Sequence, residues 1–213
     1  MTKAARLRAL LAQPGLIPMV YDNDRYEETG ELGSLFAAEA ELRGRILFLY
    51  ADILFEPIIL EKLLWSEADS AAVVDRAWVD QRDRLLPLSK PLDLVITRRA
   101  PQTGLRAMPA GGEDTLVRIG QRLVPEEATG EFIGMALFSE RGTQALRDAY
   151  VEARGAERRP FHEAESVEGA AFTDLLQELV ARGHSVACVD VYKGWLEVDT
   201  FEDYQRAWAE VTA

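Results

Sequence analysis

The sequence predicts an α/β fold in which a mainly parallel sheet is flanked by helices. Residues 45–51 (RILFLYA) form a continuous apolar run, which is typical of a strand buried on both faces of a parallel sheet. Residues 172–181 have the pattern of an amphipathic helix that Gly183 ends, and a second apolar strand, 185–192, follows. Strands that alternate with helices in this way favour the α/β class.

Composition narrows the class of protein. The chain has 213 residues, 48% of them hydrophobic, which is enough for a sizeable core, so we expect one domain over residues 1–213. The net charge of -12 argues against nucleic acid or an anionic membrane as the main partner, because both would be repelled. The single cysteine, Cys188, lies in an apolar run and is expected in the core. Without a disulfide pair, a membrane span or a signal peptide, we expect a cytoplasmic protein.

The remaining elements are predicted from periodicity and from helix start and stop signals. Helices are expected at residues 4–13, 34–42, 57–65 and 139–153, and strands at 16–21, 70–74, 93–97, 116–123 and 131–138. Pro57 suits a first helical turn, and Ser139 is a plausible N-cap. A last helix is expected after Thr200, with Asp203 completing a capping box and Tyr204, Ala207 and Trp208 forming the buried stripe.

Three carboxylates stand where the chemistry of such a fold is usually found. Asp52 ends the run 45–51, and Glu197 and Asp199 follow the later strand. In a strand, residues two apart share a face, and ligands of open α/β sheets bind at the carboxyl ends of the strands. Hard oxygen ligands suit Mg²⁺, and such a site favours phosphoryl or nucleotidyl transfer. Two simpler interpretations stay open: an alternating solvated pair for Glu197 and Asp199, and a helix cap for Asp52.

Five pieces of the chain, in order and spacing, carry a resemblance to a known family. They are Val20-Tyr21-Asp22-Asn23 with Tyr26, Glu31 and Ser34-Leu35; Tyr50 to Phe55; Gly130 to Gly134; Phe172 to Leu176; and Gly194 to Thr200. Together they resemble the nucleotidyltransferases related to phosphocholine cytidylyltransferase. The closest likeness is to the cytidylyltransferase domains of phosphonate biosynthesis, which are often fused to phosphoenolpyruvate mutase. The resemblance extends from about residue 14 to the end.

The resemblance implies a GT-A-like fold of the nucleotide-diphospho-sugar transferase type. It further implies that Asp52, Glu197 and Asp199 bind Mg²⁺, with Asp52 and Asp199 catalytic, and that a phosphonate or phosphate oxygen attacks the α-phosphate of CTP and releases pyrophosphate. Candidate substrate contacts are Tyr26, Ser34, Glu131, Lys193 and Trp195, with Arg98 and Arg99 as further cations for the anionic substrate. As alternatives, the cations are solvated surface charges, the aromatic residues belong to the core, and Glu131 has a turn role.

One departure from the family is expected to matter. The family begins with a strand and a Gly-rich loop carrying Arg and Lys, whereas residues 1–13 contain no glycine and one lysine, Lys3. The first β-α-β segment has no match, so the domain looks N-terminally incomplete and the edge of strand 45–51 is expected to lack its neighbour. Three explanations stay open: the protein starts further upstream, a partner chain or self-association covers that edge, or the chain is a remnant.

Activity of this chain alone is therefore expected to be impaired, with weak affinity for CTP. Two other functions stay open. One is a non-catalytic binding module that keeps the fold, and the other is a sugar-phosphate nucleotidyltransferase that uses another nucleoside triphosphate.

Overall fold

The structure, a computed structural model, describes residues 19–79, 91–99, 114–156 and 160–211. Within these residues the main sheet has six strands in the order β1, β6, β3, β7, β5, β4. The long strand β6 also pairs with β4, so the order closes on itself in a barrel-like way. The strands are β1 (Ile46–Leu49), β3 (Ser70–Asp75), β4 (Leu94–Thr97), β5 (Asp114–Gly120), β6 (Gly130–Phe138) and β7 (Ala187–Val191).

Strand direction corrects part of the predicted fold class. Among the described strands of this sheet, only β3 and β7 pair in parallel, while the other pairings are antiparallel. The α/β class is confirmed, but the prediction of a mainly parallel sheet is wrong. The run 45–51 was predicted to be a strand buried on both faces. Instead, β1 is a four-residue edge strand with Leu47 and Leu49 exposed. So short an apolar run does not distinguish an edge strand from a buried central one.

β1 lies at an edge of the described sheet. β1 pairs with β6 on one side, and no second strand pairs with it in the part of the chain that the structure describes. An edge of this kind can accept an added strand. The partner expected there stays a prediction.

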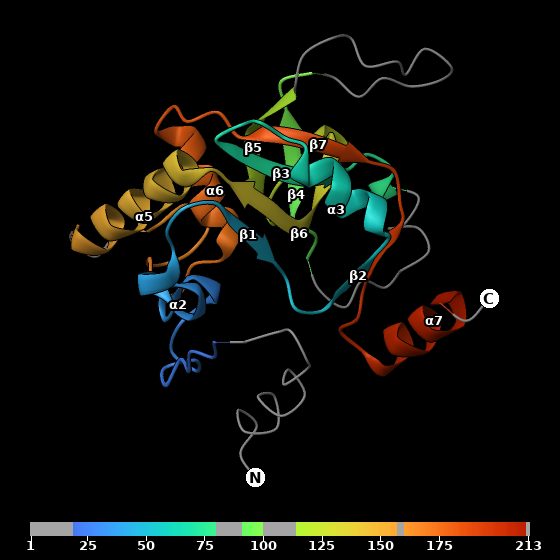
Figure 1. Ribbon diagram of the computed structural model, residues 1–213, viewed down its shortest axis with the longest axis horizontal. Helices are drawn as coiled ribbons and strands as arrows, with labels where there is room; N and C mark the ends of the chain where they lie inside the picture. The colour runs from blue at the N-terminus through green and yellow to red at the C-terminus, as the bar shows by residue number, and fades with distance from the viewer. Residues whose placement is uncertain (1–18, 80–90, 100–113, 157–159, 212–213) are drawn as a thin grey trace.

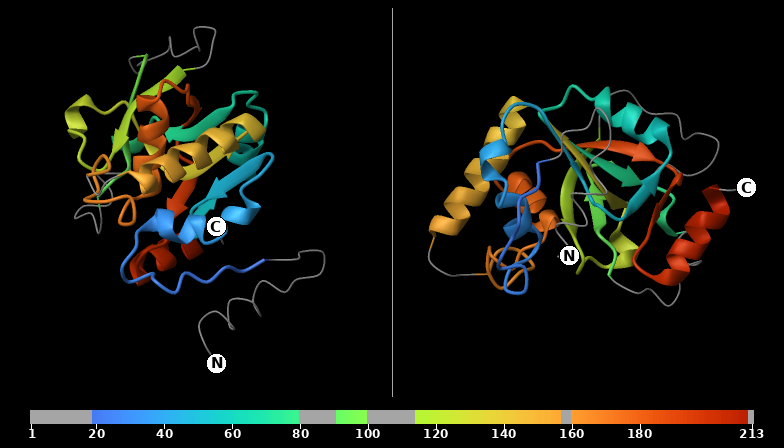
Figure 2. Two further views of the ribbon diagram at one scale, coloured as in Figure 1. Left: turned by 90° about the vertical axis from the view of Figure 1, so that its left-hand side faces the viewer. Right: turned by 60° about the horizontal axis from the view of Figure 1, so that its bottom comes forward.

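Helices cover both sides of the sheet and form two core clusters. α2 (Glu31–Phe36), α5 (Glu140–Gly155) and α6 (Phe172–Ala181) lie on one side, and α3 (Pro57–Leu64) lies on the other (Figures 1 and 2). In β3, Ala72 and Val74 belong to the first cluster, and Ala71 and Val73 belong to the second. β3 is therefore buried on both faces, which is why residues 71–74 between Ser70 and Asp75 are all apolar.

The other predictions agree with the structure to different degrees. α3, α5 and α6 and strand β3 are confirmed within a residue or two, and the Gly142 amide donates to the Ser139 hydroxyl cap at 3.2 Å. Helix 34–42 is wrong, because α2 begins earlier and a short turn, η1 (Glu39–Glu41), follows it. Strand 116–123 is displaced, since β5 ends at Gly120. The predictions for residues 4–13 and for 16–18 lie outside the described residues, whereas residues 19–21, predicted as the end of the first strand, have no regular secondary structure.

The last helix, α7 (Phe201–Val211), has the predicted start but not the predicted packing. Asp203 and Thr200 cap it as a capping box. Ala207 is buried, but Tyr204 and Trp208 are 51% and 61% exposed, so the predicted buried stripe is wrong. Figure 1 shows α7 at one side of the molecule. The Tyr204 ring stacks on the rings of Phe201 and Trp208.

Two expectations from composition can be compared with the structure. Cys188 is buried in β7, where burial raises the pKa of its thiol, so it is a core residue as expected. No helix in the described ranges combines the length and the apolar character that crossing a bilayer requires.

A buried arginine forms hydrogen bonds to several strands of the closed sheet. Arg76, directly after β3, has a side chain only 6% exposed. Its Nε donates to Asp190 of β7 at 2.8 Å, and its Nη2 donates to Asp114 of β5 at 2.8 Å. Its Nη1 donates to the Thr97 hydroxyl of β4 at 3.0 Å and to the Thr129 carbonyl, just before β6, at 3.1 Å. One guanidinium therefore joins the ends of all five strands that form the closure.

Arg76→Met tests this role, because methionine keeps an unbranched apolar side chain but leaves the Asp114 carboxylate buried without its cation. We expect the free energy of unfolding, measured by urea denaturation, to fall by about 3–5 kcal/mol. The control is Arg141→Met, which removes the exposed pair with Asp69 and should cost about 0–1 kcal/mol. Equal, small losses in both variants would contradict the role of Arg76.

Candidate metal centre

The three predicted carboxylates lie together. Asp52 is in the turn after β1, Glu197 ends the short strand β8 (Trp195–Glu197), and Asp199 follows two residues later. One carboxylate oxygen from each lies within 4.8 Å of the others. Asp52 and Asp199 are exposed and Glu197 is half-buried, so the oxygens are accessible to an ion and to a second ligand.

A small antiparallel ladder brings them together, not the parallel sheet edge that was predicted. β2 (Ile53–Phe55) pairs with β8, and Ile53 stands opposite Glu197. One step further, the Val198 amide donates to the Asp52 carbonyl at 2.8 Å. The backbone on either side of Asp52 and Glu197 is therefore fixed by hydrogen bonds, which sets the spacing of the carboxylates.

The cap of α7 holds the far end of this segment. Asp203 accepts hydrogen bonds from the Thr200 amide at 2.8 Å and from the Asp199 amide at 3.3 Å. Burial alone would raise the pKa of Asp203, but the hydrogen bonds from Thr200 outweigh burial and lower it. Asp203 thus stays ionised as a cap and fixes the backbone of Asp199.

The turn before β8 is held from inside the sheet. Lys193 and Gly194 both have left-handed backbone conformations, with φ of 65° and 82°. Trp195 is 7% exposed, and its indole nitrogen donates to the Asp75 carboxylate at 3.0 Å. Asp75 itself was not among the predicted site residues; the available signal was a charged residue that ends the otherwise apolar strand β3.

The other candidate contacts are spread over the fold. Glu131 is buried in β6 and stands in register with Asp75. The Ser34 hydroxyl accepts from Asn23 at 3.1 Å, and the exposed Tyr26 hydroxyl donates to Glu27. Ser34 is on α2, and Figure 1 shows α2 across the molecule from α7. The substrate roles of these residues stay predictions.

The donor set fits Mg²⁺. Magnesium is usually held by one or two carboxylates, with water and substrate phosphate filling the remaining octahedral positions. Asp52 and Asp199 are exposed, so water and substrate phosphate have access to an ion held by the cluster. They also concentrate negative charge, so a phosphate would approach only with a cation between them.

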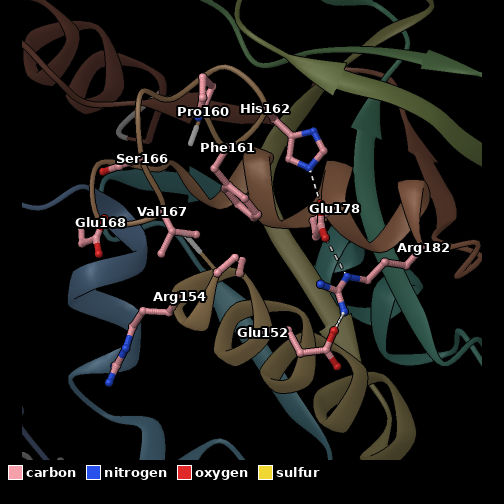
Figure 3. A pocket seen from close by; sticks show the side chains of 12 residues that line it. Glu152, Arg154, Pro160, Phe161, His162, Ser166, Val167, Glu168, Glu178 and Arg182 are labelled. Atoms are coloured by element: carbon pink, nitrogen blue, oxygen red, sulfur yellow. Dashed lines mark hydrogen bonds and ion pairs between the residues drawn. The ribbon is translucent and has the colours of Figure 1, made fainter. Parts of the chain in front are cut away.

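Away from the carboxylate cluster, a pocket that the sequence did not predict lies between α5, α6 and the loop before α6. Its volume is about 480 Å³. Figure 3 shows its charged wall: His162 meets Glu178 at 2.7 Å, and Arg182 bridges Glu178 and Glu152, both at 2.7 Å. Burial would raise the pKa of Glu178, but its hydrogen bonds to Arg182 and His162 lower it. These four charged groups pair with one another, and no member of the carboxylate cluster lines this pocket.

Comparison with known proteins gives two kinds of match. No family model matches the chain. The CTP:phosphoglutamine cytidylyltransferase of Campylobacter jejuni is 22% identical over 190 residues, which cover 86% of this chain and 69% of that protein.

Solved structures match over most of the chain. The inositol-1-phosphate CTP transferase from T. maritima superposes with a TM-score of 0.67 at 18% identity, over 98% of this chain and 71% of that one. The CTP:phosphocholine cytidylyltransferase from Streptococcus pneumoniae gives 0.50 at 11% identity, over 90% and 67%. The chain therefore has the α/β fold of nucleotidyltransferases of the nucleotide-diphospho-sugar transferase type.

Proposed function

We propose that the chain is a cytidylyltransferase that moves the cytidylyl group of CTP to a small phosphorylated or phosphonate acceptor. The observation that carries the proposal is the cluster of Asp52, Glu197 and Asp199. Support for CTP comes from relatives that are named for CTP and for phosphorylated acceptors.

In the proposed reaction an acceptor oxygen attacks the α-phosphorus of CTP. A new phosphorus–oxygen bond forms, the bond from the α-phosphorus to the bridging β-oxygen breaks, and pyrophosphate leaves. Mg²⁺, when bound, would supply positive charge against the phosphate oxygens as the transition state spreads its negative charge. The three carboxylates would hold that ion, and of the three, Asp52 and Asp199 are exposed.

Lys or Arg side chains are also needed to bind the phosphate groups of the substrates, because the chain carries a net charge of -12 and its acidic cluster repels free phosphate. Lys193, two residues before β8, is the proposed contact to the acceptor or to the leaving pyrophosphate. Trp195, Glu131, Ser34 and Tyr26 stay proposed contacts of the substrates.

The metal is tested by titrating the purified protein with Mn²⁺ in a calorimeter, with Mg²⁺ as competitor. Asp199→Asn keeps the shape of the side chain and removes its charge. We expect the affinity for Mn²⁺ to fall at least about tenfold, because tenfold is already lost when a residue that only hydrogen-bonds to a metal ligand is changed. Glu126→Gln removes the same charge at an exposed position outside the cluster and should bind as the wild type does. Equal affinities in all three proteins would contradict the metal site.

The reaction is tested by incubating the protein with CTP, Mg²⁺ and a panel of acceptors, and by following pyrophosphate release. The panel contains phosphocholine, a 2-aminoalkyl phosphonate, inositol-1-phosphate and glucose-1-phosphate, with ATP, GTP and UTP replacing CTP in parallel. We expect release with CTP and at least one acceptor, and a loss of about a hundredfold or more in Asp52→Asn. Metal-dependent CTP binding without release from any acceptor would favour the non-catalytic alternative.

A further inference from the structure

The carboxylate at the end of β3 is fully enclosed. Asp75 has no exposed surface, and its strand lies between β7, where Asp75 faces Val191, and β6, where it faces Glu131. Removing a carboxylate from water is costly unless hydrogen bonds replace the lost water. Its partners therefore indicate what Asp75 does.

Those partners lie in the segment that carries the acidic cluster. Asp75 Oδ1 accepts from the Lys193 amide at 3.1 Å, and Oδ2 accepts from the Trp195 indole at 3.0 Å. These residues are 118 and 120 positions away along the chain. One further bond, from the Ala77 amide at 2.8 Å, fixes the carboxylate on its own strand.

The segment needs such an anchor because its backbone is unusual. Lys193 has φ of 65°, a left-handed conformation that side chains other than glycine rarely adopt. Gly194 follows at 82°, and a Cβ there would lie 3.3 Å from the Glu56 carboxyl carbon. The Gly194 carbonyl in turn accepts from the Glu56 amide at 2.8 Å. Asp75 on one side and Glu56 on the other therefore hold the turn.

Trp195 links Asp75 to the strand that carries Glu197. In β8, Trp195 and Glu197 are two residues apart and so share a face. The Trp195 ring packs in the second core cluster with Ile133 and Val191. Its direction is fixed by that core and by Asp75, and the short strand then sets where Glu197 points.

We propose that Asp75 is a positioning residue of the metal centre: through the Trp195 indole and the Lys193 amide it fixes the turn and strand that present Glu197 and Asp199. The proposal rests on the proposed function, because it assumes that the cluster binds a divalent cation. The β2–β8 ladder holds the same strand from its other side. Asp75 and β2 together keep the three carboxylates within reach of one ion.

Asp75→Asn tests the proposal with the smallest change. Asparagine keeps one oxygen for the Lys193 amide but turns a second donor toward the Trp195 indole. We expect Mn²⁺ binding, measured by calorimetry, to weaken by about 10- to 100-fold, as for other residues that orient metal ligands. The control is Leu179→Ala, which destabilises the fold from the first core cluster and should leave the affinity unchanged.

A double-mutant cycle separates positioning from general destabilisation. Trp195→Phe keeps a ring in the core and removes the indole donor, so it breaks the same link from the other end. The double variant, Asp75→Asn with Trp195→Phe, is expected to bind Mn²⁺ with about the affinity of whichever single variant binds less tightly. The reason is that both substitutions remove the same hydrogen bond. Additive losses, or wild-type affinity in both single variants, would overturn the proposal. If the wild type binds no Mn²⁺, the proposed function itself fails.

Discussion

The buried guanidinium of Arg76 is the contact on which the rest of the fold depends. A barrel-like sheet closes only if strands far apart in sequence meet at one place, and here Asp190, Asp114 and Thr97 meet there through one side chain. Burial alone would raise the pKa of Asp114, but the hydrogen bonds it accepts lower it, so it stays a carboxylate. A buried pair of this kind specifies which strands meet, because an unpaired charge in that place would be costly.

The next residue back along the chain extends this organisation to the candidate site. Asp75 and Arg76 follow one another at the end of β3, and their side chains bind different parts of the fold. Arg76 joins the strands of the closure, whereas Asp75 holds the turn that leads to Glu197 and Asp199. The place where the sheet closes and the place where the carboxylates converge are thus connected through two neighbouring residues.

Several residues of the resembling pieces have structural tasks. Glu31 accepts from the Phe172 amide at 2.8 Å, at the start of α6, and its other neighbour is the Tyr50 hydroxyl at 3.2 Å. Burial, together with the facing carboxylates of Asp93 and Glu31, raises the pKa of Tyr50, which therefore stays neutral. Asp174 holds the loop before α6 by accepting from the Glu163 amide at 2.8 Å. These contacts explain residue types that the sequence alone associates only with a family.

Local signals predicted α3, α5 and α6 well, because Pro57, Ser139 and the apolar stripe of α6 act within one turn of their own positions. Strand direction could not be predicted in this way, since the same apolar run suits an edge strand or a central one. The clustering of the carboxylates was expected for a different reason from the one the structure gives: the three-residue strands β2 and β8 are too short to show a pattern. The contacts of Asp75 with Lys193 and Trp195 join positions 118 and 120 residues apart, and no local pattern indicates such pairs.

The central claim is that the carboxylate cluster and the phosphates of CTP bind one metal ion. Electron–nuclear double resonance of Mn²⁺ bound to the protein in the presence of CTP tests this claim directly. Phosphorus nuclei of CTP couple strongly to manganese only when their phosphate oxygens are ligands of the ion. We predict a phosphorus coupling in the wild type that disappears in the protein carrying Asp52→Asn and Asp199→Asn together. A coupling of the same size in both proteins, or none in the wild type at saturating CTP, would contradict the claim.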